Sequence, residues 1–171
     1  MSCNQTLAGI VMDCATSQGG IKEVYIANYD DVASVTVSEN EITAIEMSDD
    51  AKFKKYQFRK QTGSMTSTLN VDDTAGINYV STELSLVFTK METAKRIEIS
   101  ALAQGHLAVI VKDCNNMCWY LGKDDYVSAS AGSANTGTAK GDSNNYSITL
   151  KDESNTFPYL VSESLIDSIT E

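Results

Sequence analysis

The stretch that decides the fold runs from Glu83 to Gly122 and reads ELSLVFTKMETAKRIEISALAQGHLAVIVKDCNNMCWYLG. Apolar and β-branched residues predict strands over 83–89, 107–112 and 118–121, and the middle of the stretch predicts a helix over about 90–104. Elsewhere the chain consists of short strand-like segments and polar turns. We therefore expect this helix to be the only substantial one, packed on a sheet.

Both ends of this helix carry signals in the sequence. Thr89 and Glu92 fit a capping box, in which the two side chains satisfy free backbone N–H groups reciprocally. Gly105, just past the last periodic residue, is typical of a left-handed C-terminal cap.

The faces of the helix are less clear. One broad apolar arc is predicted to face the core, and it contains Met91, Ala94, Ile97, Ala101 and Leu102. Glu98 falls inside this arc, whereas Ile99 and Ala103 fall on the far side. The helix is either a surface helix with stray apolar residues or a helix that also touches a neighbouring chain. Under the second interpretation, Glu98, Ile99 and Ala103 are subunit-interface candidates.

Strand-like segments separated by short turns fill the rest of the chain. They cover residues 22–28, 34–38, 41–47, 53–60, 65–71, 79–89, 126–131 and 146–151. Glu39 and Asn40 stand where a two-residue hairpin turn belongs. We expect a loop over 132–145, which is rich in Gly, Ser and Thr, and a last turn or frayed tail over 164–170. This order predicts one mainly β domain over 1–171, a β-sandwich or barrel with one packed α-helix.

A loop is predicted between two of the long strands. It consists of Asp72, Asp73, Thr74, Ala75, Gly76, Ile77 and Asn78. Ile77 is apolar in an otherwise polar tip, next to the flexible Gly76. The loop is either a solvent-exposed hairpin turn or a docking element for another copy of the chain.

Positive charge is concentrated in residues 52–60, which read KFKKYQFRK. Two interpretations stay open. The segment is a charged edge strand that discourages aggregation, or a basic face that pairs with acidic groups on another copy.

Composition excludes several classes of function. The 171 residues carry a net charge of −10, which argues against a nucleic-acid-binding surface. We expect neither a membrane span nor a signal peptide. Cys3, Cys14, Cys114 and Cys118 lack zinc-ribbon spacing and are expected to be reduced thiols.

No constellation of catalytic residues stands out. The paired acids, such as Asp72-Asp73, do not lie in a calcium-binding loop pattern. His106 is the only histidine, and no nucleophile elbow or phosphate-binding loop accompanies it. We expect no catalytic centre, no metal and no cofactor.

Several stretches resemble phage tail tube proteins, particularly those of phages of Bacteroides and related bacteria. They are GGIKEVYIANYDDV, DDTAGINYVSTELSLVF, METAKRIEISALA, VIVKDCNNMCWYLG and, after the glycine-rich loop, YSITLKDESNTFPYLV. Together they cover most of the chain, as patterns of packing and turn residues without a catalytic signature.

The resemblance implies a virion structural protein assembled in the bacterial host cytoplasm. Subunits of such proteins close into hexameric rings that stack into a tail tube, and a long hairpin loop contributes to stacking. The implied partners are further copies of the chain and other tail proteins, with DNA passing through the channel unbound. Six copies at −10 each would carry roughly −60, a field that repels phosphates.

Two other classes of protein fit the same sequence. One is a different phage structural protein, such as a head decoration or head-tail connector subunit. The other is a carbohydrate-binding β-sandwich in which Trp119, Tyr120 and Tyr126 form a stacking platform. Exposed, coplanar rings would favour the carbohydrate-binding protein, and buried rings the structural one.

Overall fold

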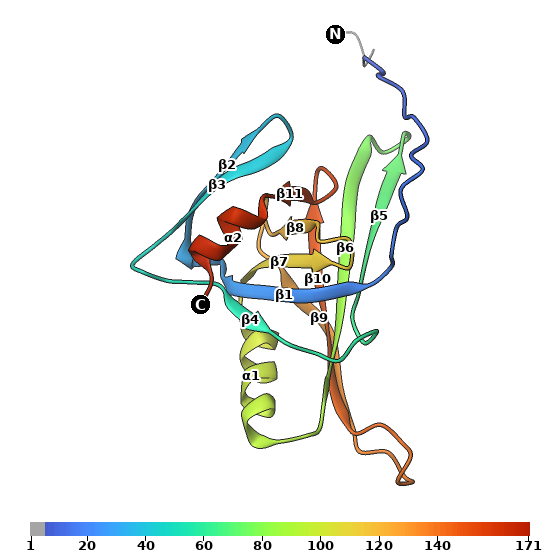
Figure 1. Ribbon diagram of the computed structural model, residues 1–171, viewed down its shortest axis with the longest axis vertical. Coiled ribbons are helices and arrows are strands. Elements are labelled where there is room, and N and C mark those ends of the chain that lie inside the picture. The colour runs from blue at the N-terminus through green and yellow to red at the C-terminus, as the bar shows by residue number, and fades with distance from the viewer. Residues whose placement is uncertain (1–5) are drawn as a thin grey trace.

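The computed structural model describes residues 6–171, and the fold is mainly β, with two sheets and two α-helices (Figure 1). The seven-stranded sheet has the order β2 (Val32–Ser38), β3 (Glu41–Met47), β11 (Tyr159–Val161), β8 (Cys118–Leu121), β7 (Leu107–Asp113), β1 (Ile21–Asn28) and β4 (Lys54–Tyr56). The four-stranded sheet has the order β5 (Ser64–Asp72), β6 (Ile77–Thr89), β10 (Asn145–Ser154) and β9 (Ser128–Asn135). The arrangement is a β-sandwich, one of the two predicted architectures. A second helix, α2 (Glu163–Ile169), stands where a last turn or frayed tail was expected, because Ile166 and Ile169 are buried and hold it on the sheet.

The centre of the seven-stranded sheet, around β7, is buried on both faces. One face packs on the four-stranded sheet, with Val109 and Val111 of β7 against Leu84, Leu86 and other residues of the first core. The opposite face, with Ala108 and Ile110, belongs to a second core. Helix α2 (Glu163–Ile169) covers this second core with Ile166 and Ile169. Burial on both faces explains why β7 is continuously apolar rather than alternating.

Helix α1 (Thr93–Gln104) exists as predicted, but its caps differ. Thr89 is the last residue of β6, and Glu92 makes no side-chain capping bond, so the capping-box prediction is wrong. Glu92 instead forms an ion pair with Lys95, 2.8 Å away. Gly105 has φ −83°, so the predicted left-handed cap is also wrong, although its N–H still donates to the carbonyl of Ala101.

The predicted apolar arc of α1 does not face the core. Leu102 is buried and Ile99 packs against the first core, whereas Ile97 is 57% exposed. Met91 precedes the helix. The prediction of the apolar arc was wrong because the helix contacts the first core through a narrow face only, which consists of Ile99 and Leu102 at i and i+3.

Other segments agree with the predictions in part. The β2–β3 hairpin is confirmed, with Glu39 and Asn40 both at positive φ in a two-residue turn. The strand expected over 53–60 is only β4, three residues long. The loop expected over 132–145 is shorter, because β9 continues to Asn135 and β10 begins at Asn145. Small residues in β9 pair with β10 despite their low strand propensity.

Candidate assembly surface

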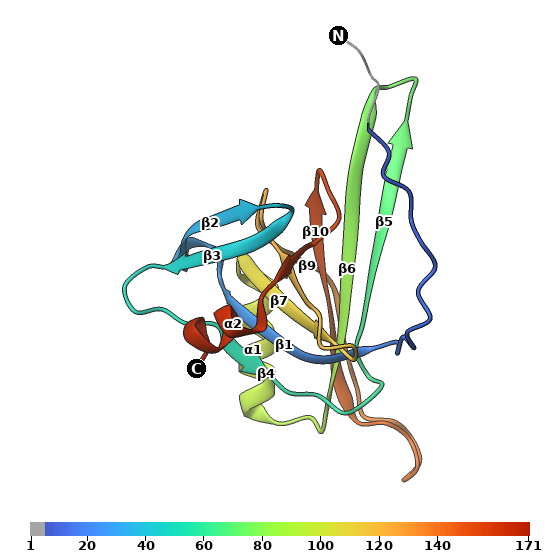
Figure 2. The same cartoon turned by 45° about the horizontal axis from the view of Figure 1, so that its top comes forward.

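Both edge strands of the four-stranded sheet lack an outer strand partner among residues 6–171, and residues 6–18 run alongside β5 without pairing as a strand (Figures 1 and 2). β5 pairs with β6 alone and β9 with β10 alone, so each leaves one row of backbone N–H and C=O groups without a strand partner. Neither strand contains Lys, Arg or Pro, the residues that proteins place on edges to prevent unwanted pairing. The two strands are nine and eight residues long. They are long enough to pair with another chain, and β9 departs from regular register with β10 only once, between Thr149 and Leu150.

The edges of the seven-stranded sheet are guarded. β4 is three residues long and contributes Lys54 and Lys55. β2, at the other edge, departs from regular register twice. Lys55 forms an ion pair with Glu23 of its own chain at 2.7 Å. The basic segment around β4 therefore matches the interpretation as a charged edge strand.

Strand direction makes the two free edges complementary. Each neighbouring pair in the four-stranded sheet is antiparallel, so β5 and β9 run in opposite directions. A second copy placed head-to-tail would set its β5 beside β9 of the first copy. That junction is antiparallel too, and it continues the pattern of the sheet.

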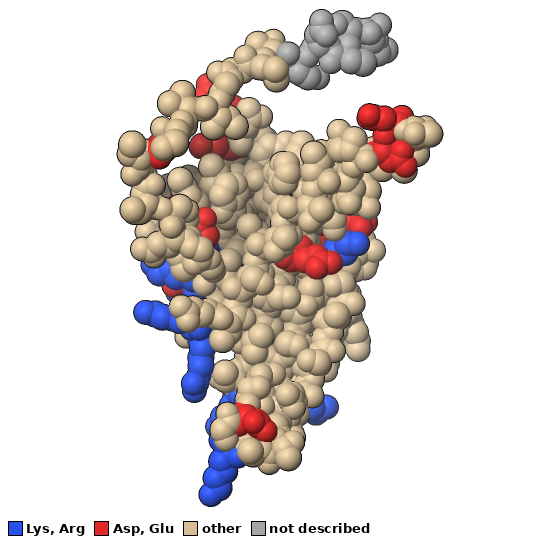
Figure 3. All heavy atoms as spheres, turned by 90° about the vertical axis from the view of Figure 1, so that its right-hand side faces the viewer, with Lys and Arg blue, Asp and Glu red and all other residues tan. Residues whose placement is uncertain are grey.

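The outer face of this sheet, which points away from the first core, is rich in hydroxyl groups. Cross-strand pairs join Ser85 to Thr149 at 3.0 Å and Ser133 to Ser147 at 2.7 Å. By register, the charged residues on this face are Asp72, Glu83, Lys151 and Glu153. On the side of the molecule where β5 lies, Figure 3 shows acidic atoms near the top, Lys and Arg atoms along the left edge and the lower end, and a small mixed cluster near the middle.

The β5–β6 hairpin extends beyond the rest of the sheet. β10 accompanies β6 only as far as the pair Ser154–Val80, and the hairpin continues past it (Figures 1 and 2). We call residues 69–79 the hairpin tip. Four of its apolar side chains are substantially exposed: Leu69 47%, Val71 57%, Ile77 47% and Tyr79 37%. Leu69 and Val71 lie on the core-side face, and Ile77 and Tyr79 on the outer face.

The turn at this tip is tighter than predicted. Only residues 73–76 lie outside the strands, so Asp72 belongs to β5 and Ile77 and Asn78 belong to β6. The Asp72 carboxylate accepts hydrogen bonds from the N–H groups of Thr74 (2.9 Å) and Ala75 (3.1 Å). Gly76 has φ +66°, which a glycine adopts without strain.

A groove lies between α1 and the β1–β4 edge, and we call it the α1–β4 groove. Its volume is about 520 Å³. Apolar lining comes from Ile26, Ala27, Ala101, Leu102 and Leu107, and charged lining from Asp31, Asp50, Lys52, Lys54, Glu98 and Glu171. Tyr56 donates a hydrogen bond to Glu98 across the groove. Burial, followed by this bond, raises the pKa of Tyr56 well above its usual value.

The three helix residues predicted at a subunit interface occupy different environments. Glu98 is exposed and lines the α1–β4 groove. Ile99 is half-buried against its own first core. Ala103 is exposed. The structure thus does not bring the three together as one surface, and Glu98 alone among them faces the groove.

The aromatic residues do not form a platform. Tyr120 is buried, and Trp119, on the opposite face of β8, donates its indole N–H to Asp113 at 3.1 Å. Tyr126 stacks on His106, with ring centroids 3.7 Å apart. The three rings therefore do not form the stacking platform of the carbohydrate-binding alternative, because alternation along β8 places Trp119 and Tyr120 on opposite faces.

Of the described thiols, the buried Cys118 is not set up as a nucleophile. Cys14, Cys114 and Cys118 are free, and Cys3 lies outside the described residues. Burial raises the pKa of the Cys118 thiol, which keeps it protonated at neutral pH. Within residues 6–171, no group of three or more His, Cys, Asp or Glu side chains is placed to hold a metal ion.

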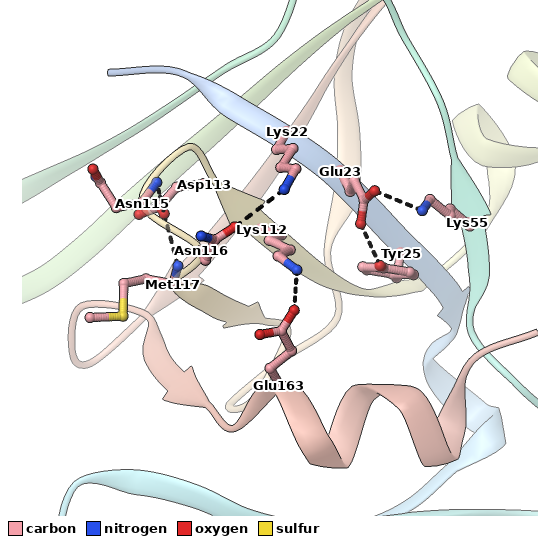
Figure 4. Close-up of polar contacts among 10 residues, drawn as sticks. All are labelled: Lys22, Glu23, Tyr25, Lys55, Lys112, Asp113, Asn115, Asn116, Met117 and Glu163. Carbon is pink, nitrogen blue, oxygen red and sulfur yellow. Dashed lines mark hydrogen bonds and ion pairs between the residues drawn. The ribbon is translucent and has the colours of Figure 1, made fainter. Parts of the chain in front are cut away.

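A polar network surrounds the β7–β8 turn (Figure 4). The Asp113 carboxylate accepts hydrogen bonds from the N–H groups of Asn115 (2.8 Å) and Met117 (2.9 Å). Lys112 forms an ion pair with Glu163, which attaches α2 to the sheet. The ion pair raises the pKa of Lys112 and lowers that of Glu163. These contacts are structural.

Comparison with family models, curated proteins and solved structures found no match for this chain. No helix within residues 6–171 is both long and apolar enough to cross a membrane. The argument about function therefore rests on the free edges, the hairpin tip and the groove. The resemblance implied open sheet edges that pair between subunits, but the sequence did not identify which strands form these edges, or the groove, because both depend on which strands end up outermost. The absence of Lys, Arg and Pro from 64–71 and 128–135 was the available signal.

Proposed function

We propose that this chain is a structural subunit that forms rings by pairing β9 of one copy with β5 of the next. The observation that carries the proposal is the pair of unguarded, antiparallel edges on one sheet. Head-to-tail contacts of this kind form closed rings when the rotation between copies allows it. Ring closure also removes both free edges, the common solution to the edge problem in β-proteins.

The proposed ring is a subunit of a phage tail tube. Six copies of the four-stranded sheet would supply 24 strands. At about 4.8 Å per strand, the wall would have a circumference of roughly 115 Å and a diameter of about 37 Å before strand tilt widens it. Such a channel accommodates a DNA duplex.

The outer face of the four-stranded sheet would line this channel. Each copy contributes three acids and Lys151 by register, so the net charge of the lining is about −2 per copy. Hydroxyl groups dominate the rest. The channel would therefore be weakly acidic and would lack the cationic groups that hold phosphates. Most of the chain's acidic charge lies elsewhere, so repulsion of DNA would be milder than the net charge suggests.

Stacking of the rings is assigned to the hairpin tip. Four exposed apolar side chains beyond the body of the sheet favour burial on a partner. Asp72, Asp73, Thr74, Ala75, Gly76, Ile77 and Asn78, proposed from the sequence as an inter-ring loop, all lie within it. A head decoration or head-tail connector subunit would form rings without long stacks.

The test is electron microscopy of the purified protein with an edge-blocked variant. Ser133→Lys with Asn135→Lys adds two charges to β9, where both residues are exposed. The matched control, Thr138→Lys with Ser143→Lys, adds the same charge to the adjacent loop. We expect rings or tubes from the wild type and the control, and monomers from the edge-blocked variant. Rings of normal number from the β9 variant would overturn the proposal.

A further inference from the structure

The N-terminal arm, residues 6–18, carries an apolar segment with no cover from its own fold. The exposed fractions are 90% for Leu7, 102% for Ile10, 92% for Val11 and 89% for Met12. The arm runs beside β5 toward the hairpin tip in both ribbon views (Figures 1 and 2). Four large apolar side chains exposed within six residues favour burial on a partner.

The base of the arm is fixed. Asn115 in the β7–β8 turn accepts a hydrogen bond from the N–H of Gln18 at 2.8 Å and donates one to its carbonyl at 3.0 Å. Two residues further on, the carbonyl of Gly20 accepts a hydrogen bond from the N–H of Cys114 at 3.1 Å. Asp113 in turn holds the backbone of Asn115 (Figure 4). The arm therefore leaves the body in a defined direction.

The α1–β4 groove lies at the other end of the molecule. Both ribbon views place α1 and β4 away from the hairpin tip, toward which the arm runs (Figures 1 and 2). β4 covers β1 only at Val24, Tyr25 and Ile26, so the edge of β1 at Ala27 has no strand partner on the groove side within residues 6–171. An extended segment can add to such an edge and place alternate side chains in the groove.

One ion pair between the arm and the groove is available, although the groove is acidic overall, because four carboxylates (Asp31, Asp50, Glu98 and Glu171) line it beside Lys52 and Lys54. Asp13, directly after Met12, is the only charged residue between 6 and 18. Lys52 lines the groove and forms no ion pair among the residues that the structure describes. Lys54 is already paired with Glu171. Lys52 is thus available to an acidic group that enters with the arm.

We propose that residues 7–12 of one copy bind in the α1–β4 groove of a second copy, with Asp13 beside Lys52. An apolar projection at one end of a molecule and a groove at the other give a head-to-tail contact that does not close on itself. This inference rests on the proposed function in one respect, because it assigns the second copy to the adjacent ring.

Binding is tested with a fluorescent peptide of residues 6–13. The receptor is the full chain carrying Ile10→Asp and Met12→Asp, so that its own arm does not compete. We expect saturable binding that weakens at least tenfold with Ala101→Glu, which places a charge in the groove. Ala94→Glu puts the same change on an exposed position of α1 that does not line the groove and should alter affinity less than twofold. Absent binding, or equal loss in both variants, would overturn the inference.

Electron microscopy separates this inference from the proposed function. Ile10→Asp with Met12→Asp in the full chain should leave single rings and shorten stacks at least fivefold, because only the contact between rings is lost. Thr6→Asp with Thr16→Asp is the control with matched charge. A wild-type protein without rings would refute the proposed function. The peptide assay would still show whether the arm binds in the groove. Stacks of normal length from the Ile10→Asp and Met12→Asp variant would refute the placement of the arm between rings.

Discussion

The Asp152 carboxylate accepts a hydrogen bond from the backbone N–H of Gly122 at 3.1 Å, and this buried contact joins the two sheets. Asp152 lies on the core-side face of β10, and Gly122 follows β8. Burial raises the pKa of Asp152 to about 6, and the hydrogen bond from Gly122 opposes this shift only partly.

The first prediction concerns pH. Because the pKa of Asp152 is raised on folding, the stabilisation from its protonated form is complete below about pH 4 and is lost as pH rises through about 6. Asp152→Asn keeps an oxygen acceptor for Gly122 and removes the charge. As pH rises from 4 to 7, we expect the free energy of unfolding of the variant to increase relative to the wild type by on the order of 2 kcal/mol. Urea unfolding at several pH values measures this gain, and parallel stability curves would contradict it.

The second prediction concerns Gly122 itself. Its φ is +90°, and a Cβ at this position would lie 3.1 Å from the carbonyl oxygen of Leu107. Gly122→Ala should therefore destabilise the fold by about 2 kcal/mol, from backbone strain and displacement of β7. Gly141→Ala is the control, because a Cβ there meets no atom within 4 Å. Equal unfolding midpoints for the two variants would show that the sheets tolerate a side chain at this junction.

The third prediction concerns the second core. Phe53 is fully buried, and its N–H donates to the carbonyl of Ile169 at 2.9 Å, next to α2. Phe53→Ala should cost about 3–5 kcal/mol of unfolding free energy, through lost burial and a cavity. Phe157→Ala removes the same ring from a position that is 54% exposed, and should cost much less. A small loss at Phe53, measured by thermal or denaturant unfolding, would mean that the second core is dispensable.

The fourth prediction concerns the hairpin tip. Replacing residues 72–78 with Asn-Gly removes the turn and the strand ends next to it, all beyond the last β10–β6 pair, so it should leave the body of the fold intact and should block tube growth. Circular dichroism checks the fold and electron microscopy the growth. A matched shortening within 136–144, at the other hairpin of the same sheet, serves as the control. Tubes of normal length from the tip variant would remove the tip from any role in stacking.

Much of the fold could be predicted from local sequence. The β2–β3 hairpin followed from alternation around Glu39-Asn40, since a two-residue turn fixes its own register. The caps and the buried face of α1 could not be predicted, because they depend on where β6 ends and where the sheet lies. β9 was missed beyond Ala131 because strands of Gly, Ser and Ala form only when a neighbour supplies hydrogen bonds.

The candidate site was predictable only at the hairpin tip, where Ile77 stood out in a polar context. The α1–β4 groove combines Ala101 of α1 with Lys52 and Ala27, residues separated by 25 or more positions in the chain. No local pattern marks such a combination. In the sequence, the arm is only a short apolar stretch. Its exposure follows from the structure, where none of its apolar side chains belongs to either core.

Head-to-tail pairing of two different edge strands, as proposed, would have a kinetic consequence. Any partial arc built by pairing β9 with β5 exposes one free β5 at one end and one free β9 at the other, whatever its length. Arcs can therefore grow from either end and anneal with one another through identical junctions. Since no intermediate is self-terminating, the curvature set at each junction alone determines how many copies complete a turn.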